Sequence, residues 1–209
     1  MLAEKHKHGL WFSASSGSVA GVTERPAGEA WRLFVALELP DEVGAMLADW
    51  RDHALATGFA GLRPVGRDQL HVTLCFLGLV QADSVAAIGR ACSTIGATGR
   101  PLLRIGEALW LPRRRPGVLA VSVDDIDGRL VEAQSALARA LTQIGAYRPE
   151  ARAFLPHVTV ARVGRGAKVR SRELEQPSAV GFEGERVTLY RSVLGRGGAR
   201  YESLHTVAL

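Results

Sequence analysis

Two stretches of this sequence are similar to each other: LHVTLCFLG at residues 70–78 and FLPHVTVAR at residues 154–162. Each contains a His-x-Thr triplet followed by an aliphatic residue, and the two histidines, His71 and His157, are 86 residues apart. With six histidines and nine threonines among 209 residues, chance predicts only roughly 0.3 triplets of this kind. The repeat therefore indicates two related structural units that carry the same short motif.

Both triplets lie in apolar runs that are typical of β-strands. Alternate side chains of a strand share a face, so the histidine and the threonine of each motif are expected to project together. The aliphatic residues between and after them then point into the core. Period two also predicts that Cys75 lies on the same face as His71. Each strand is thus expected to present one imidazole beside one hydroxyl, from His71, Thr73, His157 and Thr159.

Apolar periodicity predicts short strands and single helices around these motifs. Strands are expected at 31–39, 70–77, 102–111, 117–123, 157–162, 186–194 and 202–209, and helices at 41–58, 83–96 and 127–145. This order fits a parallel βαβ sheet or an α+β arrangement of antiparallel sheets with helices on their outer faces. The first strand is followed by ELPDEV rather than by a glycine-rich phosphate loop, which disfavours the parallel sheet.

The composition is that of a globular protein, with 47% hydrophobic and 22% charged residues and a mean hydropathy of +0.06. No apolar run approaches the length of a membrane span, so no membrane association is expected. The two cysteines, Cys75 and Cys92, form no CxxC pair, which argues against a disulfide framework and a cysteine-rich zinc site. A reducing cytoplasm is the expected location. A nucleophilic Cys75 is disfavoured because no third motif orients it.

The first thirty residues differ from the rest of the chain. They show neither apolar periodicity nor the apolar stretch and cleavage site of a secretory signal. Residues 1–30 are therefore expected to be a flexible leader or a cloning-derived extension. Residues 31–209 are expected to form a single domain.

The basic residues favour a phosphate-rich partner. The formal net charge is +5, and only three of the 26 basic residues are lysines. The planar guanidinium of arginine binds two phosphate oxygens at once, although genome composition can also enrich arginine. Three consecutive arginines, 113–115, lie between Pro112 and Pro116 in a predicted loop. This loop is either a solvated turn or an edge of the site that contacts an RNA backbone.

Two imidazoles and two hydroxyls on neighbouring strands, without a carboxylate, suit chemistry on a phosphodiester. One histidine can act as a base and the other as an acid near neutral pH, because the ordinary imidazole pKa is about 6.5. The hydroxyls can donate to the non-bridging oxygens where negative charge develops. The alternative is that both histidines are ordinary half-buried strand residues, and the matched pair argues against it.

Together with RLFVALELP at 32–40 and LYRSVLGRGGARYESL at 189–204, the two motifs make the chain from about Trp31 to Leu209 similar to the two-histidine (2H) phosphoesterases. Within them it resembles the LigT-like RNA 2′,3′-cyclic phosphodiesterases, also called 2′,5′ RNA ligases. The resemblance implies a bilobal α+β fold with two antiparallel sheets, outer helices and a central cleft. It also implies metal-free and cofactor-free hydrolysis of a terminal 2′,3′-cyclic phosphate to a 2′-phosphate, with RNA ends or nucleotides as partners of a monomer.

The resemblance also implies roles for the motif residues. His71 is similar to the general acid that protonates the departing O3′, and His157 to the base that activates water. The two hydroxyls, of Thr73 and Thr159, are expected to hold phosphate oxygens. The assignment of acid and base to the two histidines is left open by the residues themselves.

Two further residues are candidates for substrate binding. Arg162 matches an arginine that the family places near the substrate. Strict alternation puts Arg162 on the face opposite His157, so a twist, a bulge or a strand end must redirect it. Phe154 is a candidate to stack on a nucleobase, and a core position is its alternative role.

Three functions from different classes remain open at this stage. Besides the phosphodiesterase they are an inactive module that binds RNA ends and a histidine-ligated metallohydrolase. An inactive module is expected to have lost a motif histidine, and a metallohydrolase to show HExxH or clustered carboxylates. RNA ligation in the reverse direction uses the same groups, by microscopic reversibility.

Overall fold

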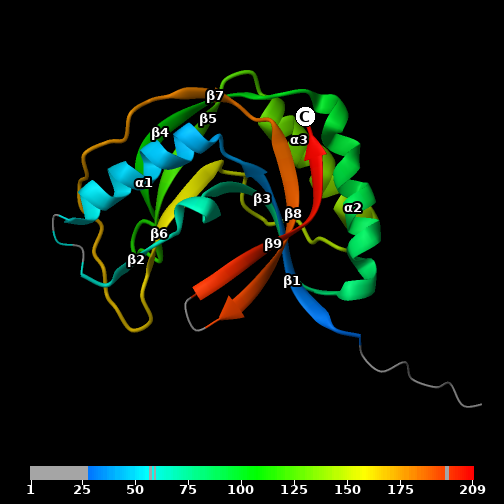
Figure 1. The fold of residues 1–209 in the computed structure, drawn as a ribbon, viewed down its shortest axis with the longest axis horizontal. Helices are drawn as coiled ribbons and strands as arrows, with labels where there is room; N and C mark the ends of the chain where they lie inside the picture. The colour runs from blue at the N-terminus through cyan, green and yellow to red at the C-terminus, as the bar shows by residue number, and fades with distance from the viewer. Residues whose placement is uncertain (1–27, 57, 59, 196–197) are drawn as a thin grey trace, which may run out of the picture.

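The computed structural model describes residues 28–56, 58, 60–195 and 198–209, so most of the expected leader lies outside the described residues. Its strands are β1 (Ala30–Glu38), β2 (Leu62–Pro64), β3 (His71–Gln81), β4 (Leu102–Leu111), β5 (Val118–Asp125), β6 (His157–Val163), β7 (Gly181–Glu183), β8 (Arg186–Gly195) and β9 (Gly198–Ala208). Its helices are α1 (Asp41–Ala56), α2 (Val85–Ser93) and α3 (Arg129–Gln143), with 3-10 turns η1 (Arg67–Gln69), η2 (Ala82–Ser84) and η3 (Thr94–Thr98). The predicted α+β class is confirmed (Figure 1).

Every strand and helix predicted from periodicity is present, and the differences lie in short segments. Strands β2 and β7 have three residues each, too few to show a period of two. The helix expected at 83–96 consists of α2 between two 3-10 turns. At its end the hydroxyls of Ser93 and Thr94 donate to the carbonyls of Gly89 and Ala91, a local bonding pattern that competes with regular helix.

The strands form one strongly curved antiparallel sheet in the order β7-β4-β5-β6-β3-β1-β8-β9, with β2 also paired to β6. It consists of two halves, one with β1, β3, β8 and β9 and the other with β2 and β4 to β7. The halves meet where β3 and β6 pair at a single position, Val72 with Val158. The two expected sheets are therefore joined through the middle residues of the two motifs.

The helices pack on the face of the sheet that carries the aliphatic motif residues. In α3, buried residues recur at helical spacing, at Leu130, Ala133, Leu137 and Leu141. They share one core with Val72 and Val158, which are fully buried. Helix α1 lies against β6, and α2 lies against α3 at the other side of the molecule (Figure 1).

The segment that leads into the first motif is tied to α1. Arg51, which is 6% exposed, donates to the backbone carbonyl of Val65 and pairs with Asp52. This bond anchors the chain between β2 and η1, directly before His71. Within the described part of the chain, no helix is both long and apolar enough to cross a membrane.

Candidate active site

The pairing of β3 with β6 brings the two motifs together. Val72 and Val158 are direct antiparallel partners, so each motif histidine lies next to the threonine of the other motif. Side chains on either side of the two valines point to the opposite face, and directly opposed residues have Cβ atoms about 4.5–5.5 Å apart. The result is one patch of alternating imidazoles and hydroxyls, made by His71, Thr73, His157 and Thr159.

A β-bulge in β6 brings Arg162 to the same face. Leu119 of β5 pairs with Ala161, and the next residue of β5 pairs with Thr159, so Val160 is an extra residue in β6. Val160 and Ala161 are both fully buried, which resets the alternation. Arg162 therefore lies on the same face as His157. The bulge is the redirection that the sequence analysis required if Arg162 is to reach the site.

The same bulge occurs at the same place in β3. Val35 of β1 pairs with Cys75 and the next residue of β1 pairs with Thr73, so Leu74 is the extra residue. The prediction that Cys75 faces the cleft is wrong: the bulge turns it into the core, where it is 1% exposed and burial raises the pKa of its thiol to about 12. Phe76 instead reaches the cleft face and is 45% exposed.

Phe76 is thus the counterpart of Arg162 in the first motif. Each follows its motif histidine by five residues, a spacing that could have identified Phe76 from the sequence once the bulge was known. One half of the site therefore presents an aromatic ring where the other presents a guanidinium group.

Both motif histidines are oriented by the backbone two residues earlier. Nδ1 of His71 lies 2.7 Å from the carbonyl oxygen of Gln69, and Nδ1 of His157 lies 2.8 Å from that of Leu155. A carbonyl oxygen only accepts, so each Nδ1 carries the proton and each Nε2 is left for chemistry. Nε2 of His71 lies 3.1 Å from Oγ1 of Thr73.

Aromatic rings surround His71. Its ring stacks on Phe34 at 5.0 Å and meets the edge of Tyr201 at 5.5 Å, while Tyr190 stacks on Phe34 at 5.3 Å. Desolvation lowers the pKa of His71 to about 4, with smaller contributions from the charges of Arg162 and His157 and against the bond to the backbone of Gln69. In the free protein His71 is therefore neutral at pH 7.

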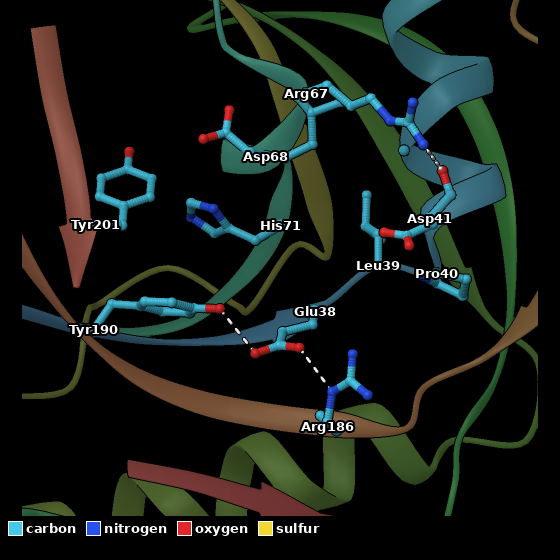
Figure 2. Close-up of a pocket in the computed structure, with 12 residues that line it drawn as sticks. Glu38, Leu39, Pro40, Asp41, Arg67, Asp68, His71, Arg186, Tyr190 and Tyr201 are labelled. Carbon is cyan, nitrogen blue, oxygen red and sulfur yellow. Dashed lines mark hydrogen bonds and ion pairs between the residues drawn. The ribbon is translucent and has the colours of Figure 1, made fainter. Parts of the chain in front are cut away.

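A half-buried hydrogen-bond network around Glu38 fixes Tyr190, one of the aromatic residues near His71. Glu38 is the direct partner of His71 between β1 and β3, and its carboxylate accepts bonds from Thr188 at 2.6 Å, Tyr190 at 2.9 Å and Arg186 at 2.8 Å. Burial opposes ionisation, but these bonds outweigh it and lower the pKa of Glu38. Figure 2 shows the bonds from Tyr190 and Arg186 beside a cavity of about 470 Å³ that His71 also lines.

Two larger cavities, each of about 640 Å³, meet at the motifs. One, termed the His157 cavity, is also lined by Phe154, Thr73 and Phe76. The other, termed the arginine cavity, is lined by Arg162, His71, Thr73 and Phe76 among others. Thr73 and Phe76 border both, so the patch of imidazoles lies where the two cavities join.

The remaining predicted residues take different places. Phe154 is half-buried in the His157 cavity, whereas Thr159 shares the motif face by register but is not among the residues that line either cavity. The arginines at 113–115 are exposed in the loop between β4 and β5, next to Pro112 of the His157 cavity. Among the described residues, no group of three or more His, Cys, Asp or Glu side chains could hold a metal ion.

Comparison with known proteins identifies the family. A family model described as the 2′-5′ RNA ligase superfamily matches residues 39–196. The chain belongs to this superfamily. The RNA 2′,3′-cyclic phosphodiesterase of Escherichia coli strain K12 is 31% identical over 185 residues, covering 87% of this chain and 98% of the relative. That of Aeropyrum pernix is 30% identical, covering 77% of this chain and 93% of the relative.

Solved structures of similar proteins share the fold. A Thermus thermophilus protein has a TM-score of 0.74 at 25% identity, covering 85% of this chain and 97% of its own. Escherichia coli LigT, crystallised with NADP+, has a TM-score of 0.72 at 28% identity, covering 87% and 99%. The resemblance inferred from the two His-x-Thr motifs is confirmed by these comparisons.

The lowered pKa of His71 predicts that acid weakens the fold. An unfolded histidine, with a pKa near 6.5, takes up a proton more readily than folded His71, so the stability contributed above pH 6.5 is lost as the pH falls toward 4. Between pH 7 and pH 5 the loss is on the order of 2 kcal/mol. Urea unfolding at both pH values should show a smaller pH dependence for His71→Gln than for the wild type.

The matched control is His53→Gln, which removes an exposed imidazole of α1 and should keep the wild-type pH dependence. Equal pH dependence in the wild type and in His71→Gln would contradict the burial of a neutral imidazole at this position.

Proposed function

We propose that the protein is an RNA 2′,3′-cyclic phosphodiesterase that opens a terminal cyclic phosphate to a 2′-phosphate with two histidines and without a metal ion. The observation that carries this proposal is the pairing of Val72 with Val158, which sets two imidazoles and two hydroxyls on one face. The relatives named RNA 2′,3′-cyclic phosphodiesterases, which this chain covers over almost their whole length, support the substrate.

In the proposed reaction a water molecule attacks the phosphorus atom and the bond to O3′ breaks. One histidine accepts the proton of the water through Nε2, and the other donates a proton to O3′. The family resemblance gives the acid to His71 and the base to His157. Because His71 is neutral in the free protein, it serves as the acid only after the bound phosphate has raised its pKa.

The other groups of the patch act on the charge of the phosphate. The hydroxyls of Thr73 and Thr159 donate to the non-bridging oxygens, and Arg162 stabilises the negative charge that develops on them. Phe154 is proposed to stack on the nucleobase in the His157 cavity, and Phe76, on the wall between the two cavities, is a second candidate for stacking.

The proposed partners are RNA ends or nucleotides that carry a 2′,3′-cyclic phosphate, bound by a monomer in the cytoplasm. Escherichia coli LigT has been crystallised with 3′-AMP, ATP and NADP+, which supports nucleotides as ligands. RNA ligation would use the same groups, with an RNA 5′-hydroxyl attacking the cyclic phosphate in place of water. The reverse of that step cleaves a 2′,5′ linkage and forms the cyclic phosphate again.

Replacement of either motif histidine by alanine should remove most of the turnover. His71→Ala and His157→Ala each delete one half of an acid and base pair, so kcat should fall by about 10²–10⁴-fold on an oligonucleotide with a 2′,3′-cyclic phosphate end. His53→Ala is the control and should retain wild-type kcat. Full activity in either motif variant would contradict the assignment of His71 and His157 as the acid and base pair. Tight RNA binding without turnover in the wild type would favour an inactive binding module.

The threonine hydroxyls should matter less than the imidazoles. Thr73→Ala and Thr159→Ala each remove one donor to developing charge, and kcat should fall by about 10²-fold. Thr73→Ser and Thr159→Ser keep the hydroxyl and should restore most of the rate. If the alanine variants turned over like the wild type, the threonines would have no place in the reaction.

The dependence of kcat/KM on pH should be bell-shaped, with its acid limb well below pH 6.5. The position of this limb follows from the lowered pKa of His71 in the free protein, because the lower pKa of an acid and base pair sets the acid limb. The acid limb of kcat should lie at higher pH than that of kcat/KM, because bound phosphate stabilises the imidazolium. EDTA should leave the rate unchanged, and activity that disappears with EDTA and returns with zinc or manganese would point to a metallohydrolase.

A further inference from the structure

Three arginines from three strands converge on the arginine cavity. They are Arg32 of β1, Arg63 of β2 and Arg162 of β6. Within the described part of the chain none of the three has an ion pair or a side-chain hydrogen bond to the protein, and Asp68 is the single carboxylate among the residues that line the cavity. The cavity therefore gathers positive charge that the protein does not neutralise.

Some arginines elsewhere on the surface are neutralised by carboxylates. Carboxylates pair with five of them at 2.8–3.4 Å: Arg100, Arg104, Arg129, Arg186 and Arg191. Other exposed arginines in the described part of the chain, such as Arg90 and Arg139, also lack an ion pair, so what distinguishes the arginine cavity is that three unpaired guanidinium groups line one concave surface.

Two of the cavity arginines face each other directly. Arg63 and Arg162 are partners in the antiparallel pairing of β2 with β6, so their side chains share one face. Like charges in directly opposed positions destabilise a sheet. A bound anion between the two guanidinium groups would remove this repulsion. Among the described residues, no carboxylate forms an ion pair with either arginine.

The third arginine is held in place by an aromatic ring. The guanidinium carbon of Arg32 lies 4.8 Å from the centre of the Phe76 ring, in a cation–π contact. Phe76 also borders the patch of imidazoles, so the charge of Arg32 is kept near the reaction centre. It remains available to a ligand, because a cation–π contact leaves the N–H donors at the edge of the guanidinium group unused.

The reacting group does not account for three positive charges. A 2′,3′-cyclic phosphate is a diester with a single negative charge, and Arg162 beside His71 is enough to balance it. In RNA the nearest other anion is the phosphate on the 5′ side of the same terminal nucleotide, which is covalently tied to the reacting one.

We propose that Arg32 and Arg63 form a second phosphate subsite that binds the 5′-phosphate of the terminal nucleotide, while Arg162 lies between this phosphate and the cyclic one. This inference rests on the proposed function and adds to it a substrate class. The enzyme then prefers nucleotides and RNA ends with a phosphate 5′ to the cyclic phosphate over plain nucleoside 2′,3′-cyclic phosphates.

The test compares kcat/KM for adenosine 2′,3′-cyclic phosphate with and without a 5′-phosphate, at constant ionic strength. The wild type should prefer the 5′-phosphorylated substrate by about tenfold or more, since bonds between charged groups are worth that much. Arg63→Gln and Arg32→Gln should each lose most of this preference. Arg104→Gln, which removes a paired arginine of β4 outside the cavity, should keep the wild-type preference.

Equal kcat/KM for the two substrates in the wild type, or an undiminished preference in Arg63→Gln, would overturn the subsite while leaving the proposed function intact. If neither substrate were hydrolysed, the proposed function would fail. The subsite would then be tested separately by measuring nucleotide binding with isothermal titration calorimetry. Adenosine 2′,5′-bisphosphate should then bind more tightly than adenosine 2′-monophosphate to the wild type but not to Arg63→Gln. Equal affinity of the wild type for both would overturn the subsite in that case as well.

Discussion

The contact between Val72 and Val158 is the constraint on which the rest of this structure depends. It is the one paired position between β3 and β6 in the described residues, and it joins the two halves of the sheet. Because both valines point into the core, their neighbours must point outward on the same side. A shift of one residue in this pairing would place the motif side chains in the core and leave no site.

The site is built by symmetry and then made asymmetric by single residues. Both motif strands carry a bulge at the same offset from the histidine, which buries two consecutive residues and turns the next one outward. That residue is Phe76 in one half and Arg162 in the other. A repeated backbone thus supplies an apolar surface and a positive charge on opposite sides of one reaction centre, as a nucleotide with a base and a phosphate requires.

The two halves also give their histidines different surroundings. His71 lies among the rings of Phe34 and Tyr201, backed by the bonds that Glu38 accepts, and is kept neutral. Phe34 comes from β1, whereas Tyr201 comes from β9, more than a hundred residues from the first motif. Burial therefore sets the protonation state of His71 in the free protein, and bound phosphate must reverse it before His71 can serve as the proposed acid.

The sequence by itself determined the local features: the two motifs, the strands and helices long enough to show a period, the α+β class and the family. It also indicated that Arg162 must be redirected. Only the tertiary structure decided where the bulges fall, that Cys75 is buried while Phe76 is exposed, and that Arg32 and Arg63 join Arg162 in one cavity. The reason is physical. Periodicity reports the preferences of neighbouring residues along the chain, whereas register, bulges and converging charges are set by partner strands that are distant in sequence.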